Sequence, residues 1–70
     1  MPNLDTVHEL LFSAATCLCE CERLLVKARR AKKPKKRVDL LFDLECTAKR
    51  AATFTASAHD LVHEIVEMEE

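Results

Sequence analysis

Three of the four cysteines form a C-x-C-x-C run at Cys17, Cys19 and Cys21, a spacing that could bind Zn²⁺ or Cu(I) if the thiols converged. On a helix, about 100° of rotation per residue places Cys17 and Cys21 on one face and Cys19 roughly opposite. The three thiols therefore cannot share one ion, and we interpret Cys17 and Cys21 as small core residues. Two copies of that pair could still form a four-sulfur site. Cys46 is predicted to face solvent.

Two histidines four residues apart, His59 and His63, have the helical spacing that lets two imidazoles bind one metal ion, and Glu67 follows one turn later. His8 would face this group if the chain folds back on itself. A site of these four residues is one alternative. The other is that they are surface residues near a helical seam, and on that interpretation the chain carries no metal and no cofactor.

The segment 27–37, KARRAKKPKKR, concentrates positive charge, since nine of the eleven basic residues fall between Arg23 and Arg37 with no acid among them. Such a block could bind the phosphates of RNA or DNA, or direct nuclear import in a eukaryote. It has no aromatic residue to stack on bases and no Asn or Gln to read adenine. A solvated turn that orients a dimer is the other interpretation. The candidate phosphate contacts are Arg29, Arg30, Lys32, Lys33, Lys35, Lys36 and Arg37.

The start of the chain carries signals for a helix N-terminus. Asn3, Asp5 and Thr6 are all suitable N-cap residues, and Thr6 with Glu9 has the spacing of a capping box. An apolar repeat follows without a helix breaker. We therefore predict a first helix over about residues 4–32.

A single proline separates this helix from the next. Pro34 disfavours a helical conformation in the residue before it but is tolerated in the first turn of a new helix. This predicts a turn over about residues 32–36 and a second helix over about 37–68. Because the 70 residues include no glycine and only two prolines, we expect one domain with few loops.

Apolar residues recur along both predicted helices in alternating steps of four and three, and the resulting stripes cover about three of every seven positions. A hairpin gives each helix only one neighbour, which is too little to cover stripes of this width. The sequence therefore predicts an all-α fold, an antiparallel two-helix hairpin that forms a homodimeric four-helix bundle. The predicted dimer core comprises Val7, Leu11, Leu18, Cys21, Leu25, Leu44, Ala51, Phe54, Ala58 and Ile65.

The net charge of −1 hides an uneven distribution of charge along the predicted hairpin. The turn is basic, and the opposite end is acidic. Two hairpins with their turns at opposite ends would place each basic turn beside the partner's acidic end. We predict this antiparallel arrangement. The seven acids of that end are Asp5, Glu9, Asp60, Glu64, Glu67, Glu69 and Glu70.

Four further residues are predicted to point away from the core. Phe12, Cys19 and Val26 recur every seven residues along the outward face of the first helix, and Phe42 has the equivalent place on the second. Exposed apolar residues in a row mark protein contact sites. A register error of one residue, which would put some of them in the core, is the alternative. We predict that these four residues bind a larger protein and modulate its activity.

Several function classes find no support in the sequence. There is no glycine-rich phosphate loop, no serine in a nucleophile turn and no pair of carboxylates in an expected cleft, so we do not expect an enzyme. No stretch is long and apolar enough for a membrane span, and the N-terminus lacks the pattern of a secretory signal. We expect a cytoplasmic protein, or a nuclear one if the source is eukaryotic.

Overall fold

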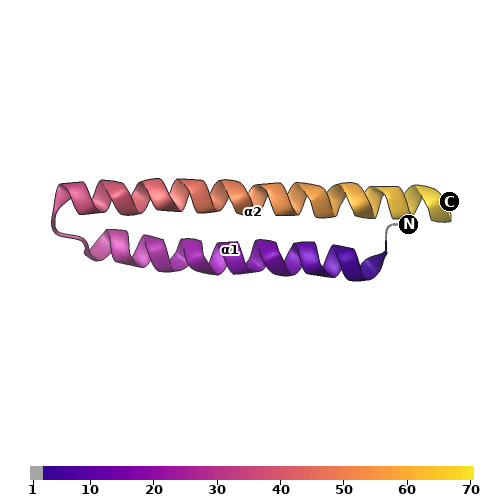
Figure 1. The fold of residues 1–70 in the computed structure, drawn as a ribbon, viewed down its shortest axis with the longest axis horizontal. Helices are drawn as coiled ribbons and strands as arrows, with labels where there is room; N and C mark the ends of the chain where they lie inside the picture. Colours follow the sequence, from indigo (N-terminus) through magenta and orange to yellow (C-terminus); the bar gives the residue numbers. More distant parts are fainter. Residues whose placement is uncertain (1–2) are drawn as a thin grey trace.

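The structure, a computed structural model, describes residues 3–70 as two long helices joined by a tight turn (Figure 1). Helix α1 spans Leu4–Arg30 and helix α2 spans Pro34–Glu69. The helices lie side by side along their length, so that the start of α1 and the end of α2 share one end of the rod (Figure 1). The predicted all-helical hairpin is confirmed.

Helix α1 begins directly after its N-cap residue, Asn3. Asn3 has extended backbone angles, and its side-chain oxygen accepts a hydrogen bond of 2.8 Å from the backbone N–H of Thr6. The Thr6 hydroxyl donates to the same oxygen at 3.2 Å. The predicted capping box with Glu9 required Thr6 to be the N-cap. The N-cap is instead Asn3, and Thr6 donates to its side chain.

The turn is shorter than predicted. Helix α1 ends at Arg30, where the N–H of Ala31 donates to the carbonyl of Ala28 at 3.3 Å, and α2 begins three residues earlier than expected. Pro34 occupies the first helical turn, where its fixed φ suits the helix and its missing N–H costs no hydrogen bond. Asp39 and Asp43 consequently lie beyond the first turn of α2, which contains no acid.

The two helices pack against each other along one line of heptad positions, which we call the seam. On α1 the seam repeats in steps of three and four, and its buried members are Val7, Ala14, Cys17, Leu24 and Ala28. On α2 only Ala51 and Ala58 are buried. Small residues at these positions let the two backbones approach closely, while larger side chains fill the layers between them. The half-buried members of the seam are Leu10 and Cys21 on α1, Ala31 just after its end, and Leu40, Leu44, Thr47, Phe54, Leu61 and Ile65 on α2.

Along part of each helix, the residues of this seam lie one position away from those that the apolar stripe predicted for the core. The hairpin packs Leu10, Cys17 and Leu24 between its helices, whereas Leu11, Leu18 and Leu25 remain exposed at the edge of the seam. The cause is the width of the apolar stripe, since one neighbouring helix covers only part of it.

Candidate interaction surfaces

A row of leucines runs along α1 beside the seam. Leu4, Leu11, Leu18 and Leu25 are spaced by seven residues, and between 37% and 71% of each residue is exposed. Leu11, Leu18 and Leu25 each lie about 40° around the helix from the seam position four residues before them, and Leu4 continues their row. The hairpin therefore leaves four leucines in one line facing solvent.

Helix α2 carries a matching row at Leu41, Ala48, Thr55 and Val62, all exposed. Because the helices run in opposite directions, the same rotation away from the seam leads to the same side of the hairpin on both. Thr55 satisfies its hydroxyl within the helix by donating to the carbonyl of Ala51 at 2.9 Å. We call these two rows together the apolar side.

The opposite side of the hairpin has a different composition. Its equivalent positions on α1 are Thr6, Ser13, Glu20 and Lys27, and those on α2 are Lys36, Asp43, Arg50, Ser57 and Glu64. None of these residues is apolar. We call this surface the polar side, and it needs no partner to remain in water.

The residues predicted to bind a larger protein lie next to the apolar side. Phe12, Cys19 and Val26 directly follow the leucines of the α1 row, and Phe42 directly follows Leu41 on α2. All four are exposed, including 68% of Phe12 and 63% of Phe42. One residue of helix adds about 100° of rotation, so these side chains face outward from the hairpin.

The structure divides the predicted dimer core into two groups. Seven of its residues lie in the seam inside one hairpin, and three lie on the apolar side. Sequence reasoning missed the half-buried Thr47, because its polarity hid the seam spacing that it shares with Leu44 and Ala51. The seven are Val7, Cys21, Leu44, Ala51, Phe54, Ala58 and Ile65, and the three are Leu11, Leu18 and Leu25.

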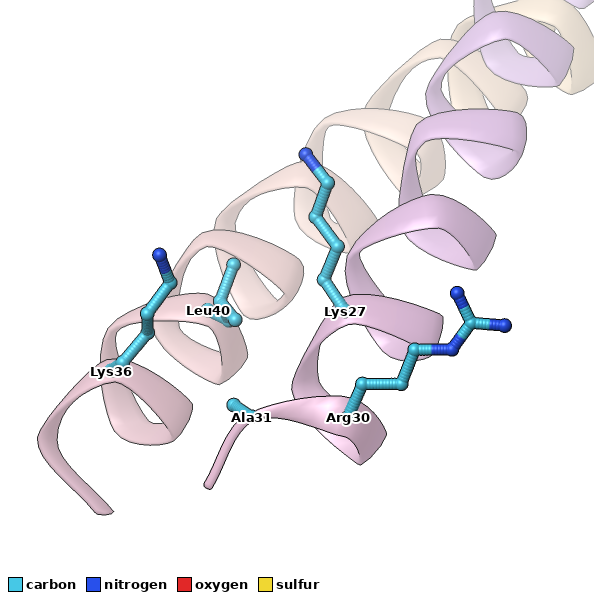
Figure 2. A pocket seen from close by; sticks show the side chains of 5 residues that line it. All are labelled: Lys27, Arg30, Ala31, Lys36 and Leu40. Carbon is cyan, nitrogen blue, oxygen red and sulfur yellow. The ribbon is translucent and has the colours of Figure 1, made fainter. Parts of the chain in front are cut away.

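A hollow of about 430 Å³ lies at the turn end of the rod, lined by residues of both helices (Figure 2). The side chains of Lys27 and Lys36 extend in a similar direction on either side of Leu40, while Arg30 points away from them (Figure 2). Among the ion pairs of residues 3–70, none involves the basic segment 27–37, and Arg23, just before it, pairs with Glu20 at 2.9 Å. The basic turn is thus largely free to attract an anion.

The start of α2 adds to this positive end. Its N-cap residue, Lys33, makes no side-chain capping bond, and no acid lies in the first turn to offset the helix dipole. The predicted phosphate contacts are exposed without exception from Arg29 to Arg37. Like the outward apolar residues, they are accessible to a binding partner.

The thiols do not converge. Cys17 is buried in the seam, Cys21 is half-buried, and Cys19 and Cys46 are exposed, with all four free. This matches the predicted separation of Cys19 from the other two cysteines of the run.

The histidines have partners on their own helix. His59 and His63 stack with ring centroids 6.4 Å apart, and His63 Nε2 lies 2.7 Å from a carboxylate oxygen of Glu67. His59 Nδ1 lies 3.2 Å from Asp60 Oδ1. Within the described chain, no three His, Cys, Asp or Glu side chains are grouped so that they could hold one metal ion, so the arrangement of His8 with His59, His63 and Glu67 is not assembled.

Comparisons with known proteins add no function. No protein-family model matches the chain, and neither a curated protein nor a solved structure does so. Neither of the two described helices is long and apolar enough to cross a membrane. The interaction surfaces are therefore the features from which a function can be argued.

Proposed function

We propose that this protein is a small non-enzymatic interaction protein, a homodimeric four-helix bundle whose outward apolar residues bind a larger protein and modulate its activity. The observation that carries the proposal is the apolar side. Four exposed leucines on α1 and a matching row on α2 form a surface that water solvates poorly. The seam residues cannot cover this surface, because they already pack against each other within the hairpin.

Dimerisation leaves a second apolar set accessible. A second copy laid on the apolar side covers the two rows, whereas Phe12, Cys19, Val26 and Phe42 point about 100° further round their helices. Two exposed phenylalanines are an unusual feature of a surface without an interaction, and aromatic residues anchor protein interfaces. This set is the proposed contact for the larger protein.

The test compares two double variants as bait in a cell extract from the native host. Phe12→Glu with Phe42→Glu is expected to lose at least one protein that the wild type captures, because each change places a charge in the proposed interface. Thr53→Glu with Ser57→Glu adds the same two charges to exposed residues elsewhere on α2 and is expected to keep every captured protein. If the phenylalanine variant stays dimeric and keeps all of them too, the proposed protein contact is wrong.

The basic turn supports a second candidate function, binding of RNA or DNA through phosphates. The supporting observation is the cluster of exposed cations around the turn, of which only Arg23 is paired in the described residues. With no base-reading side chains, such binding is expected to be independent of sequence and to weaken steeply as salt rises.

A duplex labelled with a fluorophore tests this candidate by anisotropy at low and moderate salt. Replacing Lys32, Lys33, Lys35 and Lys36 by Gln is expected to abolish binding, whereas Lys49→Gln with Arg50→Gln is expected to reduce it only slightly. The absence of wild-type binding at low salt would exclude the candidate.

A further inference from the structure

From the two rows and the charges beside them, we infer that the apolar side is the interface for a second copy of this chain, with the two turns at opposite ends of the bundle. The inference rests on the proposed homodimer and names its contact surface and its orientation. Three observations carry it: the difference between the two sides of the hairpin, the size of the rod, and the order of charges beside the apolar rows.

The size of the apolar side suits a stable interface. The whole rod is 55 Å long and 14 Å across, so one side of it, including the ends beyond the two apolar rows, has a footprint of about 770 Å². Specific interfaces bury roughly 800 Å² on each partner. The polar side has the same dimensions but would bury charges of both signs with no apolar residue between them, so it is the wrong surface for a second copy.

Two symmetric arrangements can place one apolar side on another. If the two-fold axis runs along the helices, both turns lie at the same end and each α1 faces the partner's α2. If the axis crosses the helices at a right angle, the turns lie at opposite ends and each helix faces its own copy in reverse. The apolar rows fit both arrangements, since reversal places Leu11 near the partner's Leu18 and Leu4 near the partner's Leu25.

The exposed row just outside the apolar side distinguishes the two arrangements. On α1 this row contains His8, Ala15, Glu22 and Arg29, and on α2 it contains Val38, Glu45, Ala52, His59 and Val66. At the turn, Lys27 and Ala31 line the same hollow as Leu40 and Lys36, so residues at the same height have numbers that add to about 67. By this register His8 is level with His59, and Glu22 is level with Glu45.

With both turns at one end, like groups would meet across the interface. Glu22 would approach the partner's Glu45, and His8 would approach the partner's His59. With the turns at opposite ends, His8 approaches the partner's Glu22, and His59 approaches the partner's Glu45, while Ala15 and Ala52 lie close to the two-fold axis. A carboxylate can accept a hydrogen bond from an imidazole N–H, whereas two carboxylates repel each other. Small residues also let the helices approach, so the local pattern favours opposite ends.

The long-range charges favour the same orientation. Opposite turns place the basic segment 27–37 beside the acidic end of the partner, where Glu64, Glu67 and Glu69 crowd the last turns of α2. That end lacks any basic residue in its last turn and therefore opposes its own helix dipole. The partner's basic turn would supply the missing cations, whereas turns at one end would repel each other.

Zero-length cross-linking with a carbodiimide tests the orientation on the unaltered chain, because the reagent joins an amine directly to a carboxylate that touches it. Equal amounts of ¹⁴N and ¹⁵N protein are mixed and allowed to exchange, so that mass spectrometry identifies links between copies. The expected result is a set of links from Lys33, Lys35 or Lys36 of one copy to Glu64, Glu67 or Glu69 of the other. Within one hairpin these groups lie at opposite ends of the rod.

Each other outcome overturns a defined part of the inference. A dimer with no such links, in a sample where Lys49 has reacted with Glu45 one turn away, contradicts the opposite-end orientation but leaves the proposed homodimer standing. A monomer contradicts both. Leu18→Glu on the apolar side is expected to reduce the links between copies at least about tenfold, whereas Ser57→Glu on the polar side is expected to leave them unchanged. Equal loss in both variants would show that the apolar side is not the interface.

Discussion

The two sides of this hairpin are built from the same two helices and differ only in which heptad positions they expose. The apolar side carries Leu4, Leu11, Leu18 and Leu25 with a matching row on α2, and the polar side carries hydroxyl and charged residues at every equivalent position. Both sides border the same closed seam. The difference teaches that the hairpin has, besides its packed interior, a second apolar surface that it does not cover itself, which is the pattern expected of a subunit in the proposed dimer.

A charge on the apolar side is the change with the largest expected effect. In the proposed dimer, Leu18→Glu buries two unpaired carboxylates close to the two-fold axis, and we expect the dimer to dissociate with a Kd raised roughly a hundredfold or more. Sedimentation equilibrium measures this shift. Ser57→Glu adds the same charge to the polar side and should leave the Kd unchanged, and a similar loss in both variants would remove the distinction between the sides.

Replacing alanine by leucine is expected to have different effects in the seam and on the apolar side. Ala58 is 2% exposed in the seam, so Ala58→Leu forces the helices apart and should destabilise the fold by about 1–3 kcal/mol. Ala48 lies on the apolar side and is exposed in the hairpin, so Ala48→Leu should leave the packing of the seam unchanged. Chemical denaturation of both variants checks the contrast. An Ala58→Leu variant as stable as the wild type would contradict the close packing of the seam.

The N-cap provides a reference that belongs to neither side. Asn3→Ala removes the acceptor for the N–H of Thr6, and we expect a loss of about 1 kcal/mol in the free energy of unfolding. Urea denaturation followed by circular dichroism measures it. Asn3→Asp retains the acceptor and should keep most of the stability, and an equal loss in the two variants would mean that the cap bond contributes little.

A charge reversal at the edge of the apolar side has the smallest expected effect and tests the orientation by its sign. With the turns at opposite ends, Glu45→Lys removes the carboxylate that faces the partner's His59 and should raise the Kd of the dimer about two- to fivefold. With the turns at one end, the same lysine would meet the partner's Glu22 and lower the Kd. Analytical ultracentrifugation at low salt resolves the two directions.

Much of the fold followed from periodicity. Alternating steps of three and four predicted two helices, and Pro34 located the turn to within a few residues because it restricts the backbone before it. The exact start of α2 did not follow, since proline is compatible with both a turn and a first helical position. Asn3, Asp5 and Thr6 offered three plausible caps, and only the observed hydrogen bond identifies Asn3.

The interaction surfaces were less accessible to sequence reasoning. A stripe that is three positions wide does not say which edge packs inside the hairpin and which remains for another chain, and Leu10 and Leu11 look equivalent until α2 is in place. The exposure of Phe12 and Phe42 followed from their spacing relative to the stripe. Their partner did not, because an exposed apolar residue is compatible with many ligands and specifies none.

The central claim is that the apolar side requires a second copy, and the mass of the wild-type protein in solution tests it most directly. Sedimentation equilibrium over a range of micromolar concentrations should give twice the mass of the chain, with helical circular dichroism to show that the protein is folded. A well-folded species with the mass of a single chain throughout that range would contradict the account, because the exposed leucines of α1 would then be stable in water without a partner.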